Sequence, residues 1–316
     1  MIILKILFLI ALCLLLAFSA KILQGSLEKV TKIWGIDGFI FSCIMVAFGT
    51  SLPEMVISVD AALKDNTNLA LGNIIGSNIA NISIIVGGAC LIAGKVLIPK
   101  SIHSSKIYYT FLITAIPLAM LSDGKLTRLE GILLVLIYLV WQILMIKSGN
   151  NRKSSIFKTL KLNLFNNFNL RKELTKLVIS LAVLLIASEA IVTTSINISN
   201  QFNIPQFLIG FFILAVGSSL PELAFGISAL RNNKSNLILG NIFGALVINS
   251  SLILGIACII SPIQLFYPQQ FLKTTLYYLT IFLIFYLFVR SKDRLEKWEG
   301  AFLVASYIII LALEIP

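Results

Sequence analysis

The stretch Gly49-Thr50-Ser51-Leu52-Pro53-Glu54 lies inside a long apolar segment and returns, nearly unchanged, as Gly217-Ser218-Ser219-Leu220-Pro221-Glu222 inside another. Each copy places a carboxylate directly after a proline. A charged side chain at bilayer depth costs several kcal/mol, so an acid in such a segment is interpreted as functional. Two related acids in one chain indicate a cation site.

The composition is that of a membrane protein. Hydrophobic residues make up 58% and charged residues 12% of the 316 residues, and the mean hydropathy is +0.96, whereas soluble domains are roughly 25% charged. About 20 apolar residues span a bilayer as a helix. We therefore predict an all-α integral membrane fold with about ten transmembrane helices, near residues 2–24, 38–63, 69–94, 107–121, 129–146, 177–199, 206–230, 237–262, 274–289 and 299–315.

The basic residues concentrate in alternate loops, as the positive-inside rule expects of a multi-pass protein. The formal charge of +11 is thus a topology signal, and no nucleic-acid partner is expected. The pattern predicts a plasma (cytoplasmic) membrane location with both termini outside. The basic stretch 147–172 is then a cytoplasmic linker, interpreted as solvated, with contact to anionic lipid as the alternative.

The chain contains an internal repeat at a constant offset. Glu54 and Glu222 are separated by 168 residues (222 − 54), and the same offset pairs Asn81 with Asn249 (249 − 81). Between residues 44–87 and 212–255, 18 of 44 aligned pairs are identical. About five helices per copy is an odd number, so the copies cross the membrane in opposite senses. We predict an N-terminal five-helix repeat (1–146) and an inverted C-terminal one (173–316), an arrangement typical of secondary transporters with a site near the midplane.

The prolines explain how such helices expose ligands. A proline inside a helix removes one backbone hydrogen bond, so we expect the helices to open around Gly49 and Gly217. Irregular backbone at this depth is tolerated where it is buried in protein or lines a wet cavity, and a dehydrated cation would satisfy it. The expected oxygens are the two glutamates, the hydroxyls of Ser51 and Ser219, carbonyls near Ala47–Thr50 and Ala215–Ser218, and the amides of Asn81 and Asn249.

The identity of the cation follows from this oxygen set. Calcium takes six to eight oxygens in flexible geometry, whereas magnesium prefers to keep its waters in an octahedron. Transition metals favour His or Cys, and neither is expected to be placed near the motifs. The alternative role of the two asparagines is interhelical hydrogen bonding. The chain is not expected to be an enzyme, since His103 is its only histidine and is predicted in a loop.

With these residues in place, the chain resembles the cation/calcium exchanger superfamily, and within it the prokaryotic sodium/calcium exchanger-like branch. The two alpha-repeats of that family look like residues 44–87 and 212–255, and the Ser-Leu-Pro-Glu form carries the resemblance. The resemblance implies a ten-helix antiporter in which Glu54 and Glu222 bind Ca²⁺ together. It also implies further ligands, namely the main-chain oxygens of Thr50 and Ser218 for Ca²⁺, Ala47, Ser51 and Ser77 for one Na⁺ position, Ala215 and Ser219 for its counterpart, and Asn81 and Asn249 beside the centre.

This chain departs from the family pattern at two positions. Relatives often have Asp where Asn249 stands, and Ala245 replaces the serine that would mirror Ser77. These changes remove one titratable group and one hydroxyl, so the coupling ion and stoichiometry stay open.

The function predicted from the sequence is therefore Ca²⁺/Na⁺ exchange by alternating access. Ca²⁺/H⁺ or K⁺-coupled exchange is the alternative, and a cation channel built on the same acids is a more distant one. No cofactor is expected, because Ca²⁺ and Na⁺ are cargo, and the protein is expected to function as a monomer in the lipid bilayer. The aromatic segment around Phe282 and Phe288 is interpreted as lipid-facing.

Overall fold

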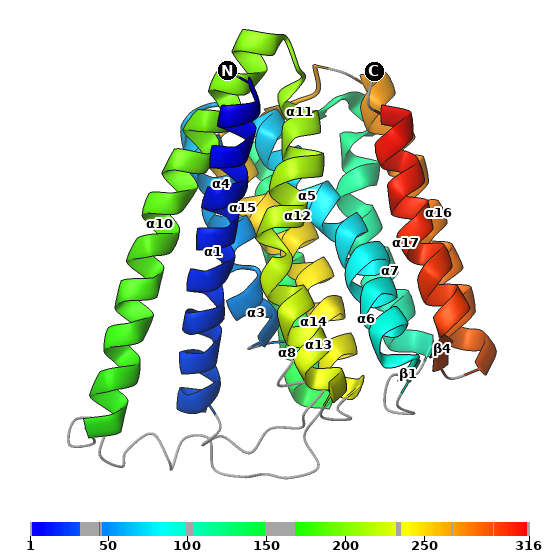
Figure 1. Ribbon diagram of the computed structural model, residues 1–316. Coiled ribbons are helices and arrows are strands. Elements are labelled where there is room, and N and C mark those ends of the chain that lie inside the picture. Colours follow the sequence, from blue (N-terminus) through cyan, green and yellow to red (C-terminus); the bar gives the residue numbers. More distant parts are fainter. Residues whose placement is uncertain are drawn as a thin grey trace.

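A computed structural model of the protein describes residues 2–31, 44, 46–98, 104–148, 168–231, 235–266, 268–292 and 294–314. These residues form a bundle of long helices (Figure 1). Most of the predicted linker, residues 149–167, lies outside the described residues, so the proposed domain boundaries stay predictions.

The helices of the two halves follow the same order. The first half contains α1 (Ile2–Thr31), α3 (Ala47–Thr50), α4 (Leu52–Leu63), α5 (Thr67–Ala80), the π-helix η3 (Asn81–Ile85), α6 (Val86–Ala93), α7 (Ser104–Met120), the 3₁₀ turn η4 (Leu121–Asp123) and α8 (Arg128–Ser148). The second contains α10 (Phe168–Phe202), α11 (Gln206–Leu208), the π-helix η5 (Ile209–Leu214), α12 (Ala215–Ser218), α13 (Leu220–Arg231), α14 (Ser235–Val247), the π-helix η6 (Ile248–Ile253), α15 (Leu254–Ile260), α16 (Pro268–Lys292) and α17 (Lys297–Glu314).

The prediction of a helical membrane protein with several spanning helices is confirmed. Within the described ranges, six helical stretches are long and apolar enough to cross a bilayer, and two shorter apolar helices, Leu4–Ser19 and Ile107–Asp123, accompany them. Thr67–Ala93 and Leu237–Ile260 are mostly buried inside the protein, whereas Arg128–Met145 is mostly exposed. The first two stretches therefore form the centre of the bundle, and the number ten stays a prediction.

The inversion of the repeats is visible in α1 and α10. The sequence offset makes these helices counterparts, and they pack against each other while running in opposite directions (Figure 1). The N- and C-terminal ends lie at the same end of the bundle, as an even number of crossings requires. Which side of the membrane this end faces stays a prediction.

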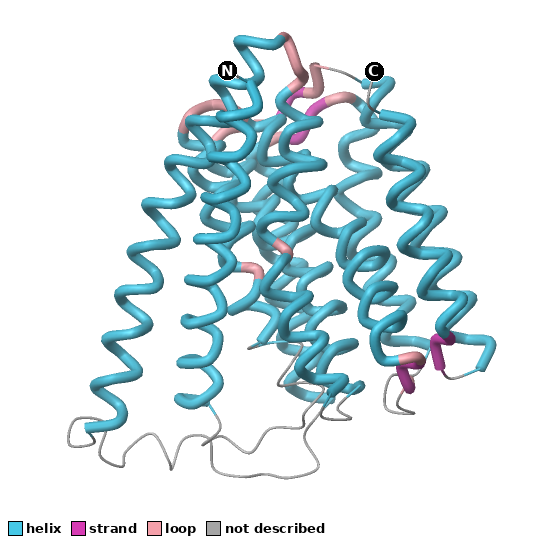
Figure 2. The backbone as a smooth tube through the Cα atoms, in the orientation of Figure 1, coloured by secondary structure: helices cyan, strands magenta, loops and turns pink. Residues whose placement is uncertain are grey.

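Short strand pairs at both ends of the bundle extend the symmetry. Strand β1 (Lys95–Leu97) pairs antiparallel with β4 (Arg294–Glu296), and β2 (Lys125–Leu126) pairs antiparallel with β3 (Ile263–Gln264). The two pairs lie at opposite ends (Figure 2). Since β1 and β3 begin 168 residues apart (263 − 95), the strand pairs are counterparts by inversion.

Two buried thiols support these strand pairs in the same way. The Cys90 thiol donates to the carbonyl oxygens of Leu295 and Glu296 at 3.4 and 3.2 Å. The Cys258 thiol donates to those of Leu126 and Thr127 at 3.2 and 3.0 Å. The cysteines are 168 residues apart (258 − 90), but their partners are 169 apart (295 − 126). The second half therefore contains one extra residue, which lies beyond the region where the two repeats match in sequence and raises the offset between counterparts from 168 to 169.

The interpretation of the aromatic segment on α16 was wrong. Phe282 and Phe285 are fully buried, and their rings pack edge to face at a centroid distance of 6.1 Å. Phe285 also meets Phe243 of α14 at 6.2 Å. Positions three apart share one face of a helix, and this face of α16 points into the bundle instead of toward lipid.

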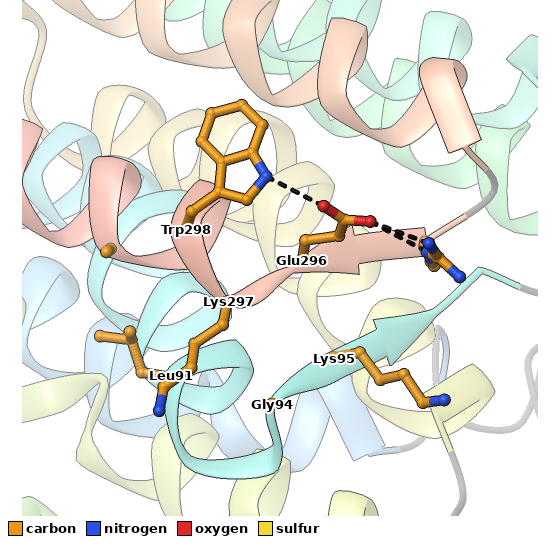
Figure 3. A pocket seen from close by; sticks show the side chains of 8 residues that line it. Leu91, Gly94, Lys95, Glu296, Lys297 and Trp298 are labelled. Atoms are coloured by element: carbon orange, nitrogen blue, oxygen red, sulfur yellow. Dashed lines mark hydrogen bonds and ion pairs between the residues drawn. The ribbon is translucent and has the colours of Figure 1, made fainter.

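An open pocket lies beside β1 and β4, at the end of the bundle away from the termini (Figure 3). The Glu296 carboxylate accepts hydrogen bonds from Arg294 at 2.9 Å and from the Trp298 indole N–H at 3.0 Å. Lys95 and Lys297 also line the pocket. Because it lies at the surface of the bundle, it is separate from the repeated motifs.

Candidate cation site

The first motif interrupts its helix at one residue. Helix α3 ends at Thr50, Ser51 adopts φ −83° and ψ 4°, and α4 begins at Leu52 with Pro53 in its first turn. A proline is well tolerated there, because the first N–H groups of a helix have no intrahelical partner. The predicted opening around Gly49 is therefore wrong in extent: residues 47–50 stay helical, and the irregular position is Ser51.

The second motif repeats this geometry. Helix α12 ends at Ser218, Ser219 has φ −85° and ψ 5°, and α13 begins at Leu220. Both interruptions appear as short loop segments at mid-height of the bundle (Figure 2). The Pro-Glu pairs thus start new helices whose N-termini face the middle of the protein, where the positive end of the helix dipole favours a carboxylate.

Glycines of both halves allow the two halves to pack closely against each other. A Cβ atom on Gly72 would lie 2.1 Å from the Phe207 carbonyl oxygen, and one on Gly76 would lie 2.4 Å from that of Phe211. A Cβ on Gly210 would lie 2.4 Å from the Leu69 carbonyl oxygen. Only glycine permits this approach, so α5 packs closely against the helix that carries the second motif.

Hydrogen bonds between the halves join the motif residues. Ser219 Oγ donates to Glu54 Oε1 at 3.1 Å. Thr50 Oγ1 donates to Asn241 Oδ1 at 3.1 Å, and the counterpart Ser218 Oγ donates to Asn73 Oδ1 at 3.4 Å. The motif of each half is therefore bonded to the central helix of the other.

Several buried oxygens at this centre have no hydrogen-bond partner. Glu54 and Glu222 are both fully buried, and Glu222 lies within electrostatic range of Glu54. The unpartnered atoms are Glu54 Oε2, both carboxylate oxygens of Glu222, Ser51 Oγ, both side-chain atoms of Asn81 and Asn249 Oδ1. Buried polar groups normally have partners, and an unpaired buried charge is far more costly. Apart from the Asn81 amide nitrogen, these atoms are oxygens that can accept, they come from both halves, and they suit a cation.

The alanine carbonyls of the predicted sodium positions are already hydrogen-bonded. Ala47 O accepts from Ser51 N at 2.9 Å. The Thr50 hydroxyl lies 3.2 Å from Ala47 O, and its single proton is shared between this oxygen and Asn241 Oδ1. Ala215 O accepts from Ser219 N at 3.2 Å and from Ser77 Oγ at 3.4 Å. A carbonyl oxygen has two lone pairs, so an ion bound at Ala215 O displaces a hydroxyl, whereas an ion bound at Ala47 O leaves the Thr50 hydroxyl bonded to Asn241 alone.

Matching π-helices place the two asparagines. Asn81 begins η3 and Asn249 is the second residue of η6. Single-turn π segments occur often at functional sites. In both copies a serine supports the irregular turn, because Ser83 Oγ donates to Ile79 O and Ser251 Oγ donates to Val247 O, each at 2.5 Å.

Four polar residues of the centre were not identified as site residues from the sequence, namely Asn73, Asn241, Asn78 and Ser250. Asn73 and Asn241 are identical at the repeat offset, which was a usable signal. Asn78 and Ser250 have Leu246 and Ile82 as counterparts, so the repeat provided no signal for them. Asn249 Nδ2 donates to Asn78 Oδ1 at 3.1 Å, and Asn78 Nδ2 donates to Ser250 Oγ at 2.6 Å.

A cysteine does lie beside one motif, contrary to the expectation from the sequence. A Cβ atom on Gly217 would lie 2.6 Å from both Cβ and Sγ of Cys13, which belongs to α1. Among the described residues, no group of three or more His, Cys, Asp or Glu side chains gathers. Carboxylate, amide and hydroxyl oxygens therefore dominate the described centre.

This geometry agrees with the comparisons to known proteins. The family model described as sodium/calcium exchanger protein matches residues 4–147 and 173–315. The chain belongs to the sodium/calcium exchanger family. It is a multi-pass membrane protein and a cation/Ca²⁺ antiporter, and the resemblance drawn from the alpha-repeats is confirmed.

Individual relatives of this exchanger cover nearly its whole length. Inner membrane protein YrbG of Escherichia coli (strain K12) is 28% identical over 309 residues, which covers 95% of the chain and 93% of that protein. Sodium/calcium exchanger MaX1 of Methanosarcina acetivorans is 28% identical, with 91% and 92% covered. A structure of the sodium-calcium exchanger NCX_Mj, soaked with 10 mM Na⁺ and 10 mM Sr²⁺, has a TM-score of 0.72 at 22% identity and covers 98% of both chains. At this identity the structural match supports the fold alone.

Proposed function

We propose that Glu54 and Glu222 form one Ca²⁺ site between the two halves, and that Na⁺ competes for the same carboxylates. The observation that carries this proposal is the set of unpartnered carboxylate and amide oxygens, contributed by both halves and fully buried. Two carboxylates balance the double charge of Ca²⁺, and the remaining ligands complete the oxygen-rich coordination that Ca²⁺ prefers. Main-chain oxygens at Thr50 and Ser218 and the amides of Asn81 and Asn249 are the proposed additional ligands.

The proposed Na⁺ positions flank this site. On one side they use Ala47 and Ser51, and on the other they use Ala215, Ser219 and Ser77. The grouping of Ser77 with Ala47 and Ser51 expected from the sequence is thereby corrected, because Ser77 Oγ lies 3.4 Å from both Ala215 O and Ser218 Oγ. Because inverted halves can exchange conformations, the central site opens alternately to the two sides. In the cell the exchanger moves Ca²⁺ outward across the cytoplasmic membrane as Na⁺ enters, with both termini outside, and it works as a monomer.

Transport by purified protein in liposomes tests this mechanism. Vesicles loaded with Na⁺ and diluted into Na⁺-free buffer with ⁴⁵Ca²⁺ should accumulate Ca²⁺, and Glu54→Ala or Glu222→Ala should abolish uptake. Asp60→Asn is the matched control, because Asp60 lies on the same helix as Glu54 but pairs with Lys64 at 3.1 Å. Absence of gradient-driven uptake by the wild type, or full activity of either glutamate variant, would refute the mechanism.

A different coupling ion is the second candidate. It is favoured by Ala245, which provides no hydroxyl opposite Ser77, and by the neutral Asn249. The same vesicles with a pH gradient or a K⁺ gradient in place of the Na⁺ gradient separate the two possibilities. If a pH or K⁺ gradient drives Ca²⁺ uptake and a Na⁺ gradient does not, the proposed Ca²⁺ site is retained and the proposed Na⁺ positions are refuted.

A further inference from the structure

Asn249 is linked through its side-chain nitrogen to two further side chains by hydrogen bonds. Its Nδ2 donates to Asn78 Oδ1 at 3.1 Å, and Asn78 Nδ2 donates to Ser250 Oγ at 2.6 Å. All three residues are buried, and Asn249 is fully so. The remaining atom of the Asn249 amide, Oδ1, has no partner.

These hydrogen bonds give the nitrogen of the amide an acceptor and leave its oxygen available to a cation. An asparagine side chain can turn its oxygen or its nitrogen toward a site, and its hydrogen bonds fix which one it presents. In the structure the nitrogen donates to Asn78, so the oxygen stays available. Because the Ser250 hydroxyl can donate as well as accept, the reverse set of bonds is also satisfied, and a cation beside Oδ1 selects the set seen in the structure. A nitrogen turned toward the centre would carry hydrogens where a cation needs a lone pair.

In the first half, Asn81 has no equivalent side-chain hydrogen-bond partner among the described residues. The counterparts of Asn78 and Ser250 are Leu246 and Ile82, which have no side-chain donor or acceptor. Both the nitrogen and the oxygen of Asn81 are without partners. Within the described part of the chain, the asparagine amide therefore has a hydrogen-bond partner in the second half only.

We propose that Asn78, supported by Ser250, is a positioning residue that directs the Asn249 carbonyl oxygen toward the transported cation. The proposal rests on the Ca²⁺ site proposed above and adds a residue that the repeat does not mark. Asn78 acts through Asn249 and does not itself bind the ion. An aspartate at position 249 would need no such positioning residue, because its two carboxylate oxygens are equivalent.

The decisive variant is Asn78→Leu, which installs the residue that the other half carries. Outer-shell partners of metal ligands typically contribute 10- to 100-fold in affinity, so we expect Asn78→Leu to raise the Kd for Ca²⁺ about tenfold. Ser250→Ala, a milder change that retains Asn78, should raise it about threefold. Asn68→Leu is the matched control, because Asn68 is a buried asparagine on the same helix whose Nδ2 donates to Gln264 O at 2.9 Å at the end of the bundle.

A second background separates positioning from packing. In Asn249→Asp, the same Asn78→Leu change should alter the Kd by less than about twofold, because either carboxylate oxygen can face the ion. A purely structural role of Asn78 would produce the same loss in both backgrounds. Kd is measured by calorimetric titration of detergent-purified protein with CaCl₂, together with the thermal midpoint of each variant.

The outcomes distinguish this inference from the proposed function. A Kd for Asn78→Leu equal to that of Asn68→Leu, or a tenfold loss that persists with Asp at position 249, overturns the positioning role. If Asn78→Leu does not fold, the threefold shift expected for Ser250→Ala decides in its place. Because binding is measured directly, wild-type protein that binds Ca²⁺ but fails to exchange it for Na⁺ overturns the exchange mechanism and still tests the role of Asn78.

Discussion

Asn249 in the second half has its nitrogen bonded to Asn78, whereas its counterpart Asn81 in the first half has no partner for either amide atom. The same contrast recurs nearby. Asn73 Nδ2 donates to Ser58 Oγ at 3.2 Å, but Asn241 Nδ2 is unpartnered because Gly226 stands where Ser58 would be repeated.

The backbone, by contrast, is closely symmetric. Among the described residues, the interrupted helices and the π segments η3 and η6 recur in both halves, and the two strand pairs that join the halves are related by the same inversion. A transporter that alternates between two openings needs equivalent backbones, since each half must adopt the conformation of the other. Ion selectivity has no such requirement, so the side chains around the centre are able to differ.

Glu54 and Glu222 are the positions at which substitution should affect the two halves equally. Glu54→Gln and Glu222→Gln each remove one of the two charges that balance Ca²⁺, and we expect each to lower Ca²⁺ uptake by at least about 100-fold, since a lost charge-assisted contact costs about 3 kcal/mol or more. Initial rates of ⁴⁵Ca²⁺ uptake measure this. A strong loss in one variant and normal uptake in the other would show that the halves are unequal at their most similar position.

The glycine contact between the halves should be the next most sensitive feature. Gly76→Ala puts a methyl group 2.4 Å from the Phe211 carbonyl oxygen, so we expect a destabilisation of about 1–3 kcal/mol, as overpacking commonly causes. Gly88→Ala is the control, since nothing lies within 4 Å of its Cβ position, and it should be neutral or slightly stabilising. Thermal unfolding in detergent compares them, and equal midpoints would contradict the packing role.

Restoring a hydroxyl should make the sodium positions more alike. Ser77 Oγ lies 3.4 Å from both Ala215 O and Ser218 Oγ, so by inversion a serine at position 245 would face Ala47 and Thr50. We expect Ala245→Ser to lower the half-saturating Na⁺ concentration about fivefold, the equivalent of one hydrogen bond of about 1 kcal/mol. Ser77→Ala should act in the opposite direction. The Na⁺ dependence of Ca²⁺ release from vesicles reports both, and an unchanged Na⁺ dependence in both variants would remove these residues from the Na⁺ positions.

The smallest effects are expected at the two ends of the bundle. Cys90→Ala and Cys258→Ala each remove thiol hydrogen bonds to a strand, so each should reduce stability by about 0.5–1.5 kcal/mol and leave exchange unchanged. Thermal midpoints of the two variants should agree with each other. A clear difference would mean that one strand pair carries more of the stability than its inverted counterpart.

The sequence by itself determined the membrane class, the paired Pro-Glu motifs and the offset that relates them. These features follow from local composition and from identity at a fixed spacing, which need no knowledge of contacts. The same reasoning placed the helix opening too early, because the position of a proline within the first turn of a new helix depends on where that helix begins. It also placed Phe282 at the lipid surface, because a purely apolar helix does not reveal which of its faces is buried.

Only the tertiary structure decided how the polar centre is assembled. The partners of Glu54, Thr50 and Asn249 lie more than 160 residues away in the chain, and two of the supporting residues, Asn78 and Ser250, break the repeat instead of following it. The extra residue that shifts the offset from 168 to 169 also emerged only from the strand and thiol contacts. Hydrogen bonds depend on distances of about 3 Å between atoms, and such distances are set by how the two inverted halves pack against each other.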